Sequence, residues 1–259
     1  MNINDISTQL LYTTVPIFTE TQNHDISIGT GFIFSVREGE DGSIPLLITS
    51  NHIFKDAING YFELHIGENG KPTNKTVRVQ FDKCVIEGNK LGNLDAIAIP
   101  LASALLSLQK QGINVFFRAV DQNMIPSLES QQNFAAIEEV TFIGYPSGIY
   151  DDKNKLPITR RGVTATPIWN NFDGKDEFLV DGGVFPGSSG SPVFIFNQGS
   201  FSAPNGIVLG NRLLFVGIIS TTLSHVNQTE KDYLNLGKVI NGRAIIRELE
   251  LFVNKIKQQ

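Results

Sequence analysis

Short apolar runs alternate with clusters of turn-forming residues from Ile26 to about residue 225. The runs are rich in Val, Ile, Thr and Phe, and Gly, Asn, Asp and Pro separate them, which is typical of strands joined by turns. The predicted strands are Ser27–Val36, Ile44–Thr49, Gly60–Ile66, Thr76–Phe81, Ala96–Leu101, Glu139–Gly144, Arg161–Ile168, Glu177–Asp181, Pro192–Phe196 and Leu213–Ser220. Since no amphipathic helix of useful length separates them, the pattern predicts an all-β fold and argues against a doubly wound sheet.

Helical periodicity is clear only at the end of the chain. From Asn241 onward, apolar residues recur at spacings of three and four, namely Ile245, Ile246, Leu249, Phe252, Val253 and Ile256. This spacing predicts a helix of about fourteen residues that packs on the body of the protein. A shorter helix is expected at Leu101–Lys110.

A polar segment over residues 118–136 is predicted to connect two groups of strands. A single domain would then contain a first group in residues 1–117, the connector, a second group in residues 137–240 and a C-terminal helix in residues 241–259. The length of 259 residues and the 41% hydrophobic composition suit such a domain and exclude disordered and fibrous proteins.

Charge and cysteine content narrow the classes of function. The net charge is −5 and no block of Lys or Arg occurs, so we expect no nucleic-acid partner. The first residues carry no basic segment before an apolar stretch, and no window is apolar enough to cross a membrane. The lone Cys84 cannot form an internal disulfide. We therefore expect a soluble, cytoplasmic protein without a membrane partner.

The most specific segment for chemistry is Gly187-Ser188-Ser189-Gly190-Ser191-Pro192. A serine between glycines, followed by Pro and an apolar strand, is typical of a nucleophile on a tight turn. Gly187 would allow its N–H and that of Ser189 to converge on one point, as binding of an oxyanion requires. The alternative interpretation of this segment is a flexible turn.

A histidine and an aspartate stand at the ends of two apolar strands. His52 follows the run Leu46–Thr49, where it can project into a cleft and act as a general base. Asp95 precedes Ala96-Ile97-Ala98-Ile99, where a carboxylate can orient an imidazole. Taken singly, each has an ordinary interpretation, as an exposed loop histidine and as a turn residue.

The order of these three residues favours catalysis over the separate interpretations. His, Asp and Ser in this sequence order form one of the known arrangements of a catalytic triad. The separations of 43 and 94 residues put His52 and Asp95 in the first strand group and Ser189 in the second. We therefore expect a triad in a cleft between two lobes. His24, His65 and His225 lack metal-ligand spacing, so no metal and no cofactor are expected.

The chain resembles the trypsin-like (chymotrypsin-fold) serine peptidases, and within them the bacterial HtrA-like branch, over about residues 26–240. The segments that carry the resemblance are Gly29–Phe32, Ile48–His52, Leu94–Ala98, Gly144–Gly148 and Gly187–Pro192. The resemblance implies two six-stranded antiparallel β-barrels of the chymotrypsin type with a C-terminal α-helix. About 34 residues follow His225, so we expect no PDZ domain.

The resemblance also implies where a substrate binds. Val216–Thr222 is similar to the strand that pairs with a substrate backbone, so Ser220 would donate to Asp95, and Thr221 and Thr222 would contact the peptide. Gly183, six residues before Ser189, would lie at the floor of the primary specificity pocket. Without an acid there, the pocket is predicted to accept a neutral or apolar P1 residue rather than Arg or Lys.

The same comparison bears on regulation. Ser188 stands where zymogens of the family have an acid that pairs with a newly cut N-terminus, so that switch is expected to be absent. Ser191 replaces the usual second glycine of the motif. The sequence thus predicts a serine endopeptidase of proteins or peptides, with a dedicated partner in bacterial stress or defence as one option. The alternative is a catalytically silent peptide-binding module of the same fold.

Overall fold

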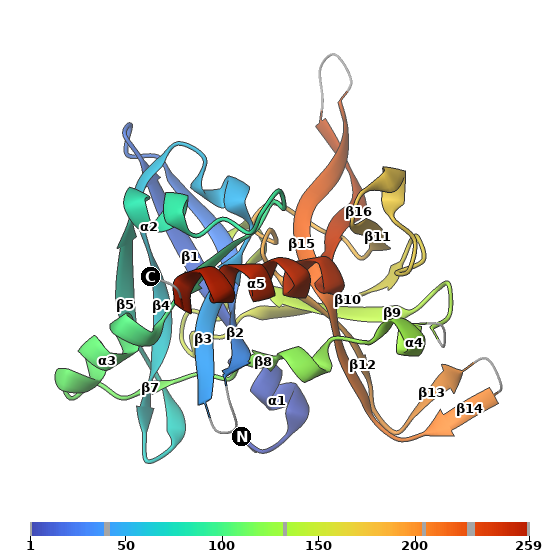
Figure 1. The fold of residues 1–259 in the computed structure, drawn as a ribbon, viewed down its shortest axis with the longest axis horizontal. Coiled ribbons are helices and arrows are strands. Elements are labelled where there is room, and N and C mark those ends of the chain that lie inside the picture. The colour runs from blue at the N-terminus through green and yellow to red at the C-terminus, as the bar shows by residue number, and fades with distance from the viewer. Residues whose placement is uncertain (1, 39–41, 132–133, 204–205, 227–230, 258–259) are drawn as a thin grey trace.

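The computed structural model describes residues 2–38, 42–131, 134–203, 206–226 and 231–257. The first strand group forms one eight-stranded sheet, and its main path runs in the order β5-β4-β1-β2-β3-β6 (Figure 1). Its strands are β1 (Thr14–Thr21), β2 (Ile26–Glu38), β3 (Gly42–Thr49), β4 (Ala57–Glu68), β5 (Lys71–Asp82), β6 (Ile97–Pro100), β7 (Val115–Phe116) and β8 (Val120–Asp121). The pairs along this path are antiparallel, while β8 joins β2 in parallel.

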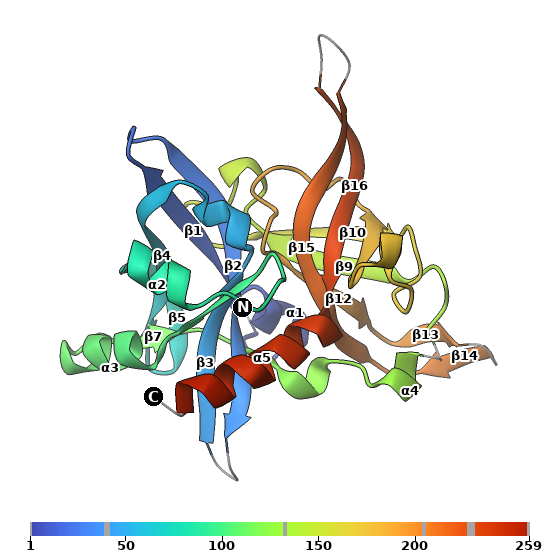
Figure 2. The ribbon, with the colours of Figure 1, turned by 45° about the horizontal axis from the view of Figure 1, so that its top comes forward.

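The second strand group closes into a six-stranded barrel in the order β10-β11-β16-β15-β12-β9. Its strands are β9 (Glu139–Gly144), β10 (Ile158–Thr164), β11 (Glu177–Asp181), β12 (Pro192–Asn197), β15 (Arg212–Val226) and β16 (Lys231–Asn241). Buried side chains such as Phe142, Phe178 and Val193 fill its interior. Figure 2 shows β15 and β16 extending together beyond the barrel. The predicted mostly β fold and the predicted six-stranded barrel of the second group are confirmed, whereas the first group, for which the resemblance implies a second six-stranded barrel, forms an eight-stranded sheet.

A further hydrophobic core lies where the two groups meet. Phe34 of β2 and Phe215 of β15 are fully buried there, and their ring centroids lie 6.1 Å apart. Helix α5 (Gly242–Lys257) adds Ile245 and Leu249 to this core and crosses both groups in Figure 1. Each fully buried side chain of this size contributes about 1.5–3 kcal/mol to folding. The predicted C-terminal helix therefore fixes the two strand groups against each other.

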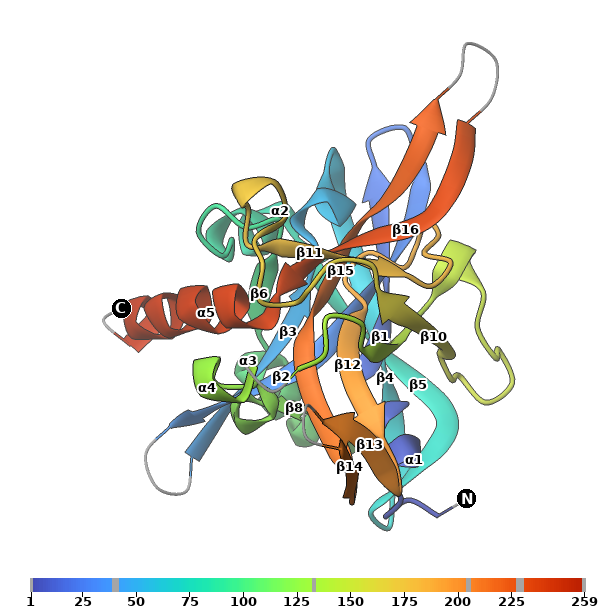
Figure 3. The same cartoon turned by 90° about the vertical axis from the view of Figure 1, so that its right-hand side faces the viewer.

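The remaining elements are short. The helices are α1 (Ile6–Leu10), α2 (Lys83–Gly88), α3 (Ala102–Lys110) and α4 (Leu128–Gln131), and the 3-10 turns are η1 (Asn51–Phe54), η2 (Gln122–Met124), η3 (Pro146–Gly148) and η4 (Phe172–Gly174). The hairpin of β13 (Ser200–Ala203) and β14 (Gly206–Leu209) projects from the body in Figure 1 and faces the viewer in Figure 3. Helix α3 agrees closely with the expected short helix. No helix among the described residues is long and apolar enough to cross a membrane.

Candidate active site

Pairing of β3 with β6 brings the histidine and the aspartate together. Thr49 of β3 faces Ile97 of β6, so the segments beyond these two residues leave the sheet side by side. His52 lies in the 3-10 turn η1 (Asn51–Phe54), and its backbone N–H donates to Asp95 Oδ1 at 2.9 Å. The Asn51 N–H donates to the Asp95 carbonyl at 3.2 Å. These two bonds fix the aspartate relative to the backbone that carries the imidazole.

The side chains of Asp95, His52 and Ser189 form a continuous chain of contacts. Asp95 Oδ2 lies 2.7 Å from His52 Nδ1, and His52 Nε2 lies 3.0 Å from Ser189 Oγ. An Nδ1–H held by the carboxylate leaves the Nε2 lone pair facing the serine hydroxyl, which is the tautomer required of a general base. The structure thus brings together the three residues that the sequence singled out, although 137 positions separate His52 from Ser189.

Strand β15 completes the surroundings of the aspartate. Ser220 Oγ donates to Asp95 Oδ2 at 3.1 Å, so this oxygen accepts from both a hydroxyl and the imidazole. The Ser189 hydroxyl also lies 3.0 Å from the Ser220 carbonyl oxygen, a second acceptor for its proton. The Ser50 hydroxyl bonds the Ile219 carbonyl at 3.2 Å and holds β15 against the end of β3.

The loop before β12 consists of two consecutive type II turns. In the first, Ser188 N–H donates to the Phe185 carbonyl at 3.0 Å, Pro186 occupies the second position and Gly187 has φ +85°. In the second, Ser191 N–H donates to the Ser188 carbonyl at 3.0 Å, and Gly190 has φ +85°. A positive φ at the third position, which glycine adopts without strain, defines this turn type. Ser189 therefore occupies the second position of the second turn, directly after the residue that the two turns share.

These turns leave two N–H groups free to bind an anion. Among the described residues, neither the Gly187 N–H nor the Ser189 N–H donates to a protein acceptor. A side chain could not replace Gly187, because its Cβ would lie 2.6 Å from the Tyr145 carbonyl oxygen. Two preorganised donors beside a nucleophile are the feature that stabilises a developing oxyanion.

Thr30 holds this loop from the opposite lobe, and sequence reasoning missed it. Its hydroxyl donates to the Gly187 carbonyl at 2.9 Å and accepts from the Tyr145 N–H at 3.0 Å. Its backbone N–H donates to the Ser189 carbonyl at 3.0 Å. Thr30 thus fixes the carbonyls that flank the two free N–H groups.

Ser188, at the position for which the sequence predicts no zymogen acid, is buried. Its hydroxyl has no hydrogen-bond partner among the described residues.

Substitution Thr30→Val is expected to lower kcat by about 10- to 100-fold. The loop that carries the two free N–H groups loses the hydrogen bonds of the Thr30 hydroxyl, while Ser189 itself is unchanged. The Gly187 carbonyl and the Tyr145 N–H would lose a partner, which costs about 1–3 kcal/mol of stability each when the groups are buried. Steady-state kinetics and thermal unfolding check both effects. Thr30→Ser, which keeps the hydroxyl, is the matched control and should stay near wild type; equal kcat in all three proteins would contradict the role.

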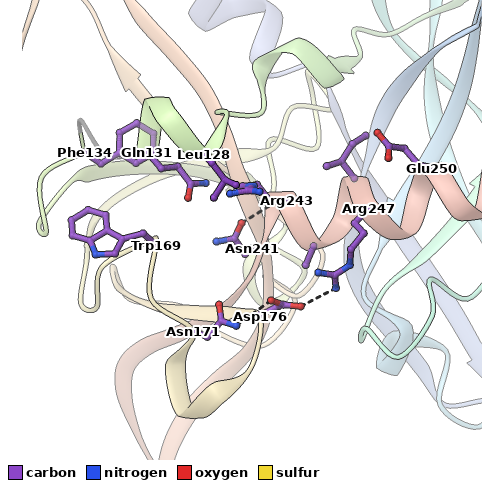
Figure 4. A pocket seen from close by; sticks show the side chains of 12 residues that line it. Leu128, Gln131, Phe134, Trp169, Asn171, Asp176, Asn241, Arg243, Arg247 and Glu250 are labelled. Carbon is purple, nitrogen blue, oxygen red and sulfur yellow. Dashed lines mark hydrogen bonds and ion pairs between the residues drawn. The ribbon is translucent and has the colours of Figure 1, made fainter.

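The cleft beside the triad has a volume of about 390 Å³ and is lined by both lobes. His52, Gly187, Ser189, Thr221 and Thr222 are among its lining residues, whereas Gly183 is not. A larger cavity of about 950 Å³ lies elsewhere, between α4 and the start of α5, where Arg247 pairs with Asp176 at 2.9 Å (Figure 4). None of His52, Asp95 and Ser189 lines this larger cavity, so the size of a cavity does not identify the active site.

A β-barrel that carries the serine and a second β lobe that carries the histidine and aspartate define the class of chymotrypsin-type serine proteases. A family model described as "Trypsin-like peptidase domain" matches residues 29–203. The chain belongs to the trypsin-like peptidase domain family.

Solved structures share the fold at low sequence identity. The serine endoprotease from Yersinia pestis matches with a TM-score of 0.52 at 13% identity, over 98% of this chain and 67% of that one. The HtrA-type protease AlgW with a tripeptide matches with a TM-score of 0.51 at 13% identity, over 93% of this chain and 60% of that one. The inactive form of Rv3671c from M. tuberculosis H37Rv matches at 0.50 and 14% identity, over 96% and 90%. No curated protein sequence matches the chain.

Proposed function

We propose that the protein is a serine endopeptidase that acts through an acyl-enzyme. Ser189 Oγ attacks the scissile carbonyl carbon while His52 Nε2 takes its proton, and the Gly187 and Ser189 N–H groups bind the oxyanion. Cleavage of the C–N bond follows as His52 returns the proton to the leaving amine. Water then attacks the acyl carbon while His52 takes its proton. The ester bond to Ser189 breaks, and His52 returns the proton to Ser189 Oγ. The observation that carries the proposal is the chain of contacts from Asp95 through His52 to Ser189, at 2.7 and 3.0 Å.

Substrate recognition is proposed to use strand addition to β15 at residues 220–222. Main-chain bonds to an added strand supply affinity, and pockets for alternate side chains supply selectivity. Thr221 and Thr222 line the cleft beside Ser189, which supports this position for the peptide. Gly183 offers no acid for a basic P1 residue, so selectivity for Lys or Arg is not part of the proposal.

A fluorophosphonate probe tests the proposal, because it reacts only with a hydroxyl activated by a neighbouring base. We expect wild-type protein to gain one adduct on the peptide that contains Ser189, and His52→Ala to gain none. Digestion of a bacterial proteome, followed by sequencing of the new termini, reports the substrates. Many cleaved proteins would indicate a general endopeptidase, and one or two would favour the dedicated partner. Absence of both adduct and cleavage would overturn the proposal and leave the silent peptide-binding module.

A cytoplasmic location is the last part of the proposal. It is supported by the single cysteine, since secreted members of the fold usually carry several disulfides. Fractionation of cells that express the protein from its own gene, with immunoblotting, tests the location. Recovery in a secreted or periplasmic fraction would contradict it.

A further inference from the structure

The guanidinium of Arg160 lies beside Gly183, the residue predicted to form the floor of the P1 pocket. We propose that Arg160 is the specificity-determining residue of the protease and binds the carboxylate of an Asp or Glu side chain at P1. This inference rests on the proposed endopeptidase function and names its substrate class. It replaces the expectation of a neutral or apolar P1 residue, which rested on the absence of an acid at Gly183.

The first observation concerns how the pocket segment is held. Gly182 and Gly183 both donate backbone N–H bonds to the Asn235 carbonyl of β16, at 3.2 and 3.1 Å. On its other edge β16 pairs with β15, where Gly237 faces Thr222. One strand therefore fixes both the segment that leads to Ser189 and the strand proposed to bind the peptide. The side chain of a P1 residue on β15 would enter between them, toward Gly183.

The second observation concerns the direction of Arg160. In β10 the side chains alternate between exposed and partly buried, and Arg160 belongs to the partly buried set while its neighbour Arg161 is exposed. A Cβ at Gly183 would lie only 2.7 Å from Arg160 Nη2. The guanidinium thus occupies the space that a side chain at position 183 would fill. Glycine at this position, with φ +62°, is what makes room for it.

The third observation concerns charge. The Arg160 guanidinium forms no ion pair with any carboxylate among the described residues. The guanidinium stacks on the ring of Phe185, whose centroid lies 4.7 Å from Cζ. Stacking on an aromatic ring holds a guanidinium in place while its N–H donors stay available. A guanidinium that is fixed in place and has no paired carboxylate can bind the carboxylate of a P1 side chain through two parallel N–H···O bonds.

Peptides that differ only at P1, with Glu, Gln, Leu or Lys, test the assignment through kcat/KM. Wild-type protein is expected to prefer Glu over Gln and Leu by about 10- to 100-fold, the range of a charge-assisted hydrogen bond. Arg160→Ala should lose this factor on the Glu peptide and change the Leu peptide by less than about threefold. Arg160→Glu should shift the preference toward Lys, an effect that simple structural damage would not produce.

Arg161→Ala is the matched control, because it removes the same charge from the outward face of the same strand. It should leave the order of P1 preferences unchanged. If Arg160→Ala does not fold, Arg160→Gln keeps the size of the side chain and gives the same comparison. Wild-type cleavage after Leu with a ratio that Arg160 variants do not alter would overturn this inference and leave the endopeptidase proposal standing. Failure of wild type to cleave any peptide or to react with a fluorophosphonate would overturn both.

Discussion

Replacing Ser189 by alanine is expected to lower kcat/KM for peptide hydrolysis by about 10⁶-fold. The substitution removes the oxygen that forms the acyl-enzyme, and His52 is left with only water to activate. Ser189 Oγ contacts His52 Nε2 and the Ser220 carbonyl, and neither contact supports the fold. Alanine also fits the turn, since the positive φ belongs to Gly190. Stability should therefore change by less than about 1 kcal/mol. Initial rates on a quenched fluorescent peptide and thermal unfolding measure the two effects.

The control for this experiment is Ser202→Ala, which removes an exposed hydroxyl from β13. It should keep both the rate and the unfolding temperature. A Ser189→Ala protein that cleaves peptides within tenfold of wild type would show that the acyl-enzyme mechanism is wrong. A protein that loses activity together with its fold would contradict the expectation that Ser189 is structurally dispensable.

The sequence pattern predicted most of the long apolar strands. It missed β1 and β16, whose polar residues become buried or paired only in the fold, and the short strands β7, β8, β13 and β14. Strand β1 contains Pro16, which weakens a strand prediction because proline lacks an N–H. In the structure, pairing with β4 begins at Ile17, so the missing donor does not interrupt that ladder. Strand β16 starts with charged residues and carries Gly237, whose partner on β15 could not be inferred locally. The position of β10 also differs, since it spans Ile158–Thr164 rather than starting at Arg161.

Local sequence patterns likewise predicted only some of the residues of the site. Triad residues were predictable because each stands in a characteristic local context and their order is itself informative. Thr30 was not, because its role depends on a carbonyl 157 positions away. Arg160 was not, because only the folded barrel brings its guanidinium to Gly183. Residues in a characteristic local motif can be predicted from the sequence, whereas residues placed at the site only by contacts between distant segments cannot.

Asp95→Asn is expected to lower kcat by about 10⁴-fold with little change in KM. The carboxylate accepts three hydrogen bonds: Oδ1 from the His52 backbone N–H, and Oδ2 from the imidazole and the Ser220 hydroxyl. An asparagine amide has one acceptor oxygen, so at least one of these donors must face its NH₂ group. With the oxygen kept on the backbone N–H, the NH₂ faces Nδ1 and forces the proton onto Nε2. The imidazole then cannot accept the proton of Ser189.

Separate measurement of kcat and KM checks this mechanism, because substrate contacts on β15 do not involve the carboxylate. Asp173→Asn is the matched control: Asp173 lies in the 3-10 turn η4 (Phe172–Gly174) with φ +52°, a conformation that asparagine tolerates. Proton NMR of the His52 ring gives a second readout, since the resonance of the Nδ1–H bonded to Asp95 should disappear in Asp95→Asn. If kcat fell by less than tenfold while that resonance was lost, the tautomer would not limit the reaction, and His52 would not be the general base.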